Sequence, residues 1–429
     1  MPNDHRLTEL DTGVRVVTEA MPSVRSVALG FWVGTGSRVE GDGQSGLSHL
    51  LEHLLFRGAS GYGSLEIDQI FDAMGAEINA GTGKETTSLY SRVLDVHLER
   101  AFDVMADMVW LPSLQEVDAE RAVVLEEIAM YEDDPQDKIF DVLGAAVFAG
   151  DPLGRAIIGR PEVIRDTPVD AIRAFHRSRY RPDNVVVAAA GSVEHERLVE
   201  LVAASVPGDE RAGDPAPRGA SASAPEVRFE RKETEQYHVC LGGTGIARDD
   251  DRRFALRVLD NILGGTSSSR LFQEVREKRG LAYSVYTFLN HYAGTGQVGL
   301  YLGTRADNLA EALAVVGAEL ERVADDPATQ DELERSKENV KGRVVLSLES
   351  TGTRMNRLGS SVLTDVPVLG IDDVIERIDA VTLDDLRQLA AELWPVRRLS
   401  AAGIGLDPDV FGEAIAPLGL TGTLVAAAA

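Results

Sequence analysis

Residues 46–60 read GLSHLLEHLLFRGAS, and the rest of the chain can be interpreted around this stretch. Its apolar residues recur at the spacing of one helical face, and Gly58 follows the last of them, which predicts a short buried helix. His49 and His53 are four residues apart and project from one side of this helix, with Glu52 beside them. Two imidazoles on successive turns can supply two ligands of a zinc site, and a neighbouring carboxylate can accept a proton from water.

The same three polar residues could instead belong to an ordinary solvated helix face. Leucine occupies nearly every other position of the stretch, so little of the helix is free to face water. Buried histidine and glutamate side chains without partners would be costly. We therefore favour a metal site over a solvated face.

Length and composition limit the classes of protein that need to be considered. The chain has 429 residues, which permits two or more domains. Its 43 basic and 69 acidic residues give a net charge of −26, which argues against nucleic acid as a partner. No apolar run is long enough to span a membrane, and the polar N-terminal stretch MPNDHRLTELDTG lacks the features of a signal or transit peptide.

The single cysteine, Cys240, rules out an intrachain disulfide and a zinc site built from several cysteines. A chain without disulfides is compatible with a reducing compartment. We therefore expect a cytoplasmic protein.

Strand-like and helix-like segments alternate irregularly along the chain, which predicts an α+β fold. Residues 207–225, PGDERAGDPAPRGASASAP, have the composition of a linker between an N-terminal domain (1–206) and a C-terminal domain (226–429). Residues 164–191 and 378–405 share a pattern of residue types at a constant offset of 214. Two helix–strand units can resemble each other by composition alone. We prefer a duplication into two homologous domains, each a mainly antiparallel sheet packed with helices.

His49, Glu52 and His53 form the pattern H-x-x-E-H, which the second half of the chain lacks. Only the first half is therefore expected to bind metal. A catalytic zinc usually has a third protein ligand. The acidic segment DAERAVVLEEIAMYEDD offers Glu120 and Glu127, two helical turns apart, and Glu126 on an adjacent face. One carboxylate could ligate while another orients a histidine. Acidic residues on helices are usually solvated, and spacing alone does not choose between Glu126 and Glu127.

These motifs together resemble those of a known enzyme family. H-x-x-E-H is the inverzincin signature, and it is followed by E-x6-E, with 73 residues between His53 and Glu127. The sequence is similar to the pitrilysin/insulinase family of zinc metallopeptidases, in the short-chain branch that includes the mitochondrial processing peptidase β subunit and bacterial processing peptidases. The resemblance implies one Zn²⁺ per chain held by His49, His53 and Glu127. Glu120 would contact one of these ligands without binding the metal itself.

Two further segments extend the resemblance. GAEINAGTGKETT is similar to the strand at the sheet edge that binds substrate in the family, with Asn79, Ala80 and Thr82 in matching places. SSRLFQEVREKRGLAYSV resembles a stretch whose arginine and tyrosine, here Arg276 and Tyr283, bind substrate near the metal. Composition alone would present this pair as an exposed arginine and a half-buried strand tyrosine.

The resemblance implies a zinc-dependent endopeptidase acting on peptides or unfolded polypeptide segments. Glu52 would be the general base on a zinc-bound water, and Tyr283 and Arg276 would assist catalysis by contacting the oxyanion and a substrate carbonyl. The substrate would be held as an added β-strand in an enclosed chamber. Family members with four such domains enclose their substrate, so a two-domain chain implies a homodimer in which Arg276 and Tyr283 act in trans, or a heterodimer with an inactive relative.

Two other functions compete with this one. The family includes non-catalytic scaffold members, but these typically lose metal ligands that the present chain retains. A peptide-binding module with a structural zinc would need no free glutamate such as Glu52, because structural zinc sites are closed. The sequence leaves the physiological substrate open.

Overall fold

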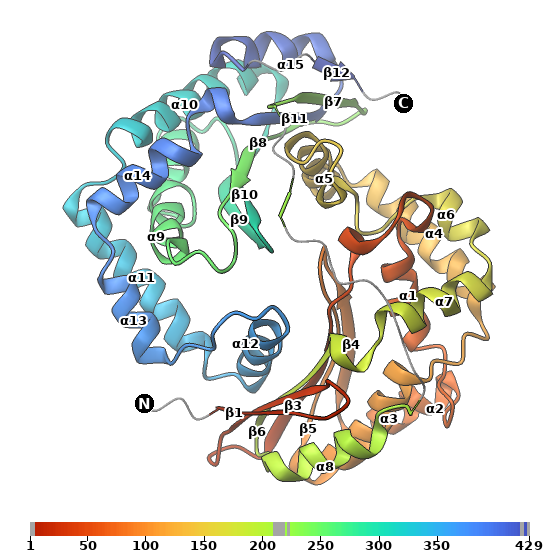
Figure 1. Cartoon of the computed structure of the whole chain (residues 1–429). Coiled ribbons are helices and arrows are strands. Elements are labelled where there is room, and N and C mark those ends of the chain that lie inside the picture. The colour runs from red at the N-terminus through yellow and green to blue at the C-terminus, as the bar shows by residue number, and fades with distance from the viewer. Residues whose placement is uncertain (1–4, 209–218, 221–223, 421–423, 427–429) are drawn as a thin grey trace. The chain divides into compact units, whose positions relative to one another are not determined.

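The computed structural model of the chain describes residues 5–208, 219–220, 224–420 and 424–426, which form two compact units (Figure 1). Each unit draws on several stretches of the chain. The first unit comprises Met1–Ile128, Ala156–Pro217 and Val345–Ile371, and the second comprises Ala129–Arg155, Arg218–Val344 and Asp372–Ala429.

The first unit is built on a mainly antiparallel sheet. Across the sheet, its six described strands are β1 (His5–Glu9), β2 (Arg15–Ala20), β6 (Val185–Gly191), β3 (Ser26–Val33), β5 (Thr87–Leu94) and β4 (Glu77–Thr82). Only the β2–β6 pair is parallel among these strands. The helices of this unit are α1 (Leu47–Leu55), α2 (Ser64–Met74), α3 (Leu98–Trp110), α4 (Val117–Asp133, which continues into the second unit), α6 (Pro161–Asp166), α7 (Val169–Arg179), α8 (His195–Ser205) and α12 (Thr351–Leu363).

The second unit is built on a similar sheet, although two pairs of its described strands are parallel instead of one. Its six described strands are, in order, β12 (Leu424–Ala426), β7 (Val227–Arg231), β11 (Ser400–Gly405), β8 (Tyr237–Gly245), β10 (Thr295–Thr304) and β9 (Ser284–Tyr292). Its helices are α5 (Pro135–Val147), α9 (Arg253–Leu263), α10 (Ala306–Asp325), α11 (Gln330–Ser347), α13 (Ile371–Asp379), α14 (Leu383–Leu393) and α15 (Pro408–Ile415). Short 3₁₀ turns occupy 37–39, 42–44, 95–97, 152–154, 182–184, 396–398 and 416–418.

The two sheets place equivalent strands in equivalent positions. β6, β3, β5 and β4 of one correspond in order to β11, β8, β10 and β9 of the other. The predicted fold class, two homologous α+β domains with mainly antiparallel sheets, is therefore confirmed.

Both faces of each central strand are covered. Every residue of β6 is buried. Val186, Ala188 and Ala190 pack with Met355 and Leu358 of α12. Val185, Val187 and Ala189 face the larger core formed with α1, α3 and α8. A strand buried on both faces reads as a continuous apolar run, as VVVAAAG does.

One face of each sheet is covered by a helix that comes from the other half of the sequence. α12, from the C-terminal half, covers the sheet of the first unit. α5, from the N-terminal half, covers the second sheet, where Ile139 and Leu143 pack with Cys240 and Tyr301. The compact units thus depart from the contiguous halves 1–206 and 226–429 by these two segments, because helical periodicity does not specify which sheet a helix covers. Most of the predicted linker, 207–225, lies outside the described residues.

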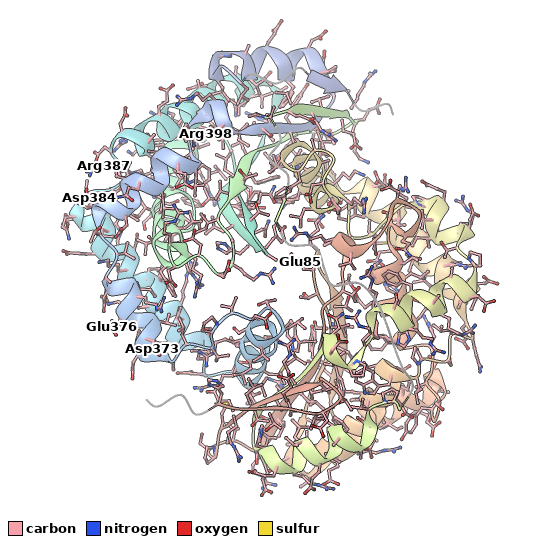
Figure 2. All side chains as sticks on the ribbon, viewed as in Figure 1. Glu85, Asp373, Glu376, Asp384, Arg387 and Arg398 are labelled. Atoms are coloured by element: carbon pink, nitrogen blue, oxygen red, sulfur yellow. The ribbon has the colours of Figure 1, made fainter. Side chains whose placement is uncertain are left out.

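The outer helices α13 and α14 account for part of the negative charge. Asp373, Glu376 and Asp384 are exposed on them (Figure 2). Asp384 forms an ion pair with Arg387, one turn further along α14. Among the described residues, no helix is both long and apolar enough to cross a membrane.

Candidate metal centre

The side chains of helix α1 differ in burial from one side of the helix to the other. Its leucines and Ser48 are buried, whereas His49, Glu52 and His53 remain partly accessible on one side. The leucines anchor the helix in the core of the first unit. The helix therefore presents two imidazoles and a carboxylate from a rigid support.

His49, His53 and Glu127 come together at this side of α1. One potential ligand atom from each residue lies within 4.8 Å of the others. Oε2 of Glu127 is 3.7 Å from Nε2 of His49 and 3.3 Å from Nε2 of His53. Two imidazoles and one carboxylate form a donor set typical of catalytic zinc, so these residues fit a zinc ion. The neighbouring Glu126 is exposed and is not part of this group.

Glu120 contacts His53 at the ring nitrogen that is not directed toward Glu127. Nδ1 of His53 is 2.8 Å from Oε1 of Glu120, whose side chain is buried. Because an ionised carboxylate only accepts hydrogen bonds, Nδ1 carries the hydrogen and Nε2 keeps its lone pair for a metal. Arg57 donates to the other carboxylate oxygen of Glu120. Arg57 is not among the site residues predicted from the sequence, although a basic residue one turn after His53 is a signal that could have indicated it.

Glu52 occupies an unusual environment for a carboxylate. Among the described residues, its Oε2 is buried and has no hydrogen-bond partner. Burial raises the pKa of Glu52, and a hydrogen bond from Thr82 partly opposes this shift. A buried oxygen without a partner is costly unless something else uses it. This oxygen is therefore available to a water molecule or a substrate group.

The environment of His49 favours its neutral form. Burial lowers the pKa of His49, and the charge of the neighbouring His53 lowers it further. Neutral imidazole is the form that ligates metals. Tyr180, which is not among the site residues predicted from the sequence, is fully buried near this group. Burial raises the pKa of Tyr180, and the charge of Glu52 raises it further.

The segment expected to bind substrate forms the edge of the first sheet. β4 pairs with β5 on one side only, among the described strands. Asn79 is exposed, and its side chain accepts a hydrogen bond of 2.8 Å from the N–H of Ala80. Ala80 and Thr82 are half-buried, and Thr82 Oγ1 lies 3.5 Å from the carbonyl oxygen of Ser48 in α1. Thr82 thus connects the edge strand with the helix that carries the histidines.

Arg276 and Tyr283 lie side by side in the second unit. The Arg276 guanidinium is 4.3 Å from the centre of the Tyr283 ring, and its Nη1 donates a 2.9 Å hydrogen bond to the Tyr283 carbonyl oxygen. Arg276 belongs to a π-helical turn, Phe272–Glu277, and Tyr283 follows this turn. Tyr283 is 76% exposed, which is unusual for an aromatic ring.

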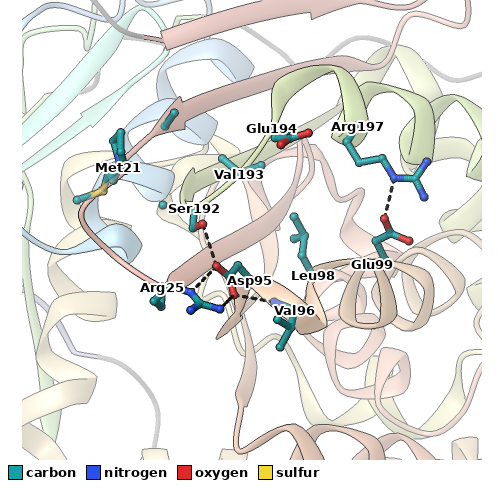
Figure 3. Close-up of a pocket in the computed structure, with 13 residues that line it drawn as sticks. Met21, Arg25, Asp95, Val96, Leu98, Glu99, Ser192, Val193, Glu194 and Arg197 are labelled. Carbon is teal, nitrogen blue, oxygen red and sulfur yellow. Dashed lines mark hydrogen bonds and ion pairs between the residues drawn. The ribbon is translucent and has the colours of Figure 1, made fainter.

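A separate hollow of about 530 Å³ opens elsewhere on the first unit (Figure 3). Four of the charged side chains that line it form two ion pairs, Arg25 with Asp95 and Arg197 with Glu99. Because these charges are already paired with each other, they give no indication of a ligand that would bind in the hollow.

Comparison with known proteins places the chain in a family. The sequence model described as Insulinase (Peptidase family M16) matches residues 15–160, and that described as Peptidase M16 inactive domain matches residues 167–340. An uncharacterized zinc protease of Streptomyces coelicolor is 44% identical over 410 residues, which cover 93% of this chain and 89% of the relative. The chain belongs to peptidase family M16.

Other M16 proteins match over similar lengths. The uncharacterized zinc protease YmxG of Bacillus subtilis is 40% identical, over 89% of this chain and 94% of the relative. Two solved structures share the fold. A protease from Helicobacter pylori has a TM-score of 0.88 at 23% identity and covers 94% of this chain and 99% of its own. A peptidase M16 inactive domain from Pseudomonas fluorescens has a TM-score of 0.87 at 22% identity and covers 94% and 98%.

Proposed function

We propose that this M16 protein is a zinc-dependent endopeptidase that hydrolyses peptides or unfolded polypeptide segments. One observation carries the proposal: the ligand atoms of His49, His53 and Glu127 converge within 4.8 Å, and the helix that bears both histidines also bears Glu52, whose buried Oε2 has no partner among the described residues. The zinc protease names of the Streptomyces and Bacillus relatives support zinc as the metal.

His49, His53 and Glu127 would hold the ion. When bound, Zn²⁺ polarises the scissile carbonyl and lowers the pKa of water. Glu120 and Arg57 hold His53 in the tautomer and orientation that ligation needs. Three protein ligands leave room for water and substrate, as in other catalytic sites.

Glu52 would act as the general base. It takes a proton from the attacking water and passes it to the leaving amine. Burial raises its pKa, which makes it a stronger base than an exposed glutamate once it is ionised. The hydrogen bond from Thr82 holds one end of the carboxylate and leaves Oε2 for the proton.

The substrate would bind as a strand added to the free edge of β4, next to α1. Main-chain hydrogen bonds along Asn79–Thr82 would recognise an extended peptide largely independently of its sequence, and enclosure in a chamber would limit substrates to short or unfolded chains. A folded protein cannot supply such a strand without unfolding locally.

Arg276 and Tyr283 would complete the site from a partner subunit in a homodimer, or in a heterodimer with an inactive relative. Tyr283 would donate to the developing oxyanion and Arg276 would hold a substrate carbonyl. The exposure of the Tyr283 ring supports a role in contacting another molecule. The cytoplasmic location expected from the cysteine content stays a prediction.

The test measures zinc content and peptide cleavage together. Wild type and Glu52→Gln are each assayed for zinc per chain and for cleavage of an unstructured peptide library, with Glu126→Gln as a control because Glu126 is exposed and outside the ligand group. We expect one zinc per chain in all three proteins and loss of cleavage only in Glu52→Gln. Zinc without cleavage in the wild type would favour a scaffold or peptide-binding role.

A further inference from the structure

Helix α1 begins at a residue that cannot cap it. The N-cap residue is Gly46, which adopts a φ of 95°. A Cβ at this position would lie 2.8 Å from Cα of Gly159 and 2.9 Å from the carbonyl oxygen of Ile158. Glycine is therefore required, both for the left-handed backbone and for the close packing. Glycine has no side-chain oxygen for the free N–H groups at the start of the helix.

Glu40 supplies the missing acceptor from six residues upstream. Its Oε2 accepts a 2.8 Å hydrogen bond from the N–H of Gly46, and its Oε1 accepts a 2.7 Å hydrogen bond from the N–H of Ser48. The residue is only 3% exposed. The next residue after Ser48 is the first histidine of the metal centre. Glu40 therefore fixes the turn of α1 from which His49 projects.

The charge of Glu40 matters as well as its hydrogen bonds. His49 is the third residue of α1, so a metal ion held there lies near the positive end of the helix dipole, which repels cations. A neutral cap such as serine would satisfy N–H groups and leave this repulsion in place. Burying a carboxylate is costly, and a negative charge at this helix end opposes the repulsion.

We propose that Glu40 is a positioning residue of the metal centre, which holds the first turn of α1 and offsets the positive helix end where the cation binds. This inference rests on the proposed function, because it assumes that His49 ligates zinc. It assigns to Glu40 a contribution to metal affinity in addition to its contribution to folding.

The test compares Glu40→Gln with Asp407→Asn. Asp407 caps α15 of the second unit by accepting a 2.8 Å hydrogen bond from the N–H of Asp409, so both variants neutralise a carboxylate at a helix N-terminus. The zinc dissociation constant is measured by competition with a chromophoric chelator, at a temperature where circular dichroism shows each protein to be folded. We expect Glu40→Gln to bind zinc about tenfold more weakly than wild type, and Asp407→Asn to bind it as wild type does.

A second readout separates positioning from simple capping. The absorption spectrum of the Co²⁺-substituted protein reports ligand geometry, and we expect it to change in Glu40→Gln and to stay unchanged in Asp407→Asn. If Glu40→Gln lowers the melting temperature of the metal-free protein but leaves zinc affinity and the cobalt spectrum as in wild type, Glu40 is an ordinary cap and the inference is wrong.

Two further outcomes are informative. If Glu40→Gln fails to fold, Glu40→Asp replaces it: this variant keeps the charge but shortens its reach, and we expect about threefold weaker zinc binding, whereas unchanged affinity would contradict the inference. A wild-type protein that takes up no zinc under metal-replete conditions would contradict the metal centre itself, and the inference with it.

Discussion

Glu52 illustrates how a single residue can be prepared for proton transfer by its surroundings. Burial raises its pKa, whereas the hydrogen bond from Thr82 lowers it. The second influence can be removed by mutation, because Thr82 belongs to β4 whereas Glu52 belongs to α1. The pH dependence of peptide cleavage can therefore report on it.

The first prediction concerns the acid side of the pH profile. Glu52 must be ionised to accept a proton, so kcat/KM should fall as pH is lowered through its pKa. Because burial raises this pKa, the fall should begin at a higher pH than an exposed glutamate would give. Thr82→Val removes a hydrogen bond that lowers the pKa, and should shift the acid limb to still higher pH. Thr86→Val, in the adjacent turn, is the control; an acid limb at the same pH in Thr82→Val and wild type would contradict this reasoning.

Arg57 provides the second prediction at this scale. Its guanidinium contacts the buried carboxylate of Glu120, which in turn holds His53. Arg57→Met would leave that carboxylate without its cation and loosen the orientation of His53. We expect zinc affinity to fall by about tenfold, with partial recovery in Arg57→Lys. Chelator competition measures this, and Arg100→Met, which changes an exposed arginine hydrogen-bonded to Tyr62, should bind zinc normally. Wild-type affinity in Arg57→Met would show that Glu120 needs no cation.

At the scale of the element, the two exchanged helices offer a matched pair of glycines. Gly359 in α12 packs against Trp32, and a Cβ there would lie 2.1 Å from Nε1 of the indole. Gly144 is likewise a buried glycine within α5, but a Cβ there would meet nothing within 4 Å. The same substitution should therefore have opposite effects in the two helices.

We predict that Gly359→Ala destabilises the protein by about 1–3 kcal/mol through overpacking. Gly144→Ala should stabilise it by about 0.5–1 kcal/mol, because alanine loses less backbone entropy in a helix. Urea unfolding of both variants beside wild type measures the difference. Equal shifts of the unfolding midpoint would mean that α12 moves to accommodate the methyl group.

Local patterns could be predicted from the sequence more fully than long-range ones. Helix α1 lies within the stretch 46–60 whose apolar periodicity predicts it, and the spacing of His49 and His53 is set by the helix itself. The choice between Glu126 and Glu127 depends on how α4 rotates against α1, which no local pattern records. The same holds for the sheet that α12 covers and for Glu40, whose role requires a turn that brings it back to Gly46.

At the scale of the whole molecule, the proposed dimer can be tested by mixing inactive variants. Glu52→Gln removes the proposed base and Tyr283→Phe removes the proposed oxyanion donor. If Tyr283 acts in trans, a mixed dimer contains one site with both residues intact, and activity should recover to about a quarter of wild type after subunit exchange. If the residues act within one chain, the mixture stays inactive. Native mass measurement establishes whether exchange has occurred.

The exchange of α5 and α12 also bears on how the chain is made. While the first half is being synthesised, the sheet that will carry the metal centre lacks the helix that covers Val17, Val186 and Ala188, since α12 comes from the second half. Domains generally fold as units during translation, and exposed apolar surface at that stage promotes aggregation. The nascent N-terminal half is therefore a natural client for a chaperone, and a gene cut within the predicted linker would produce two fragments that need each other to become soluble.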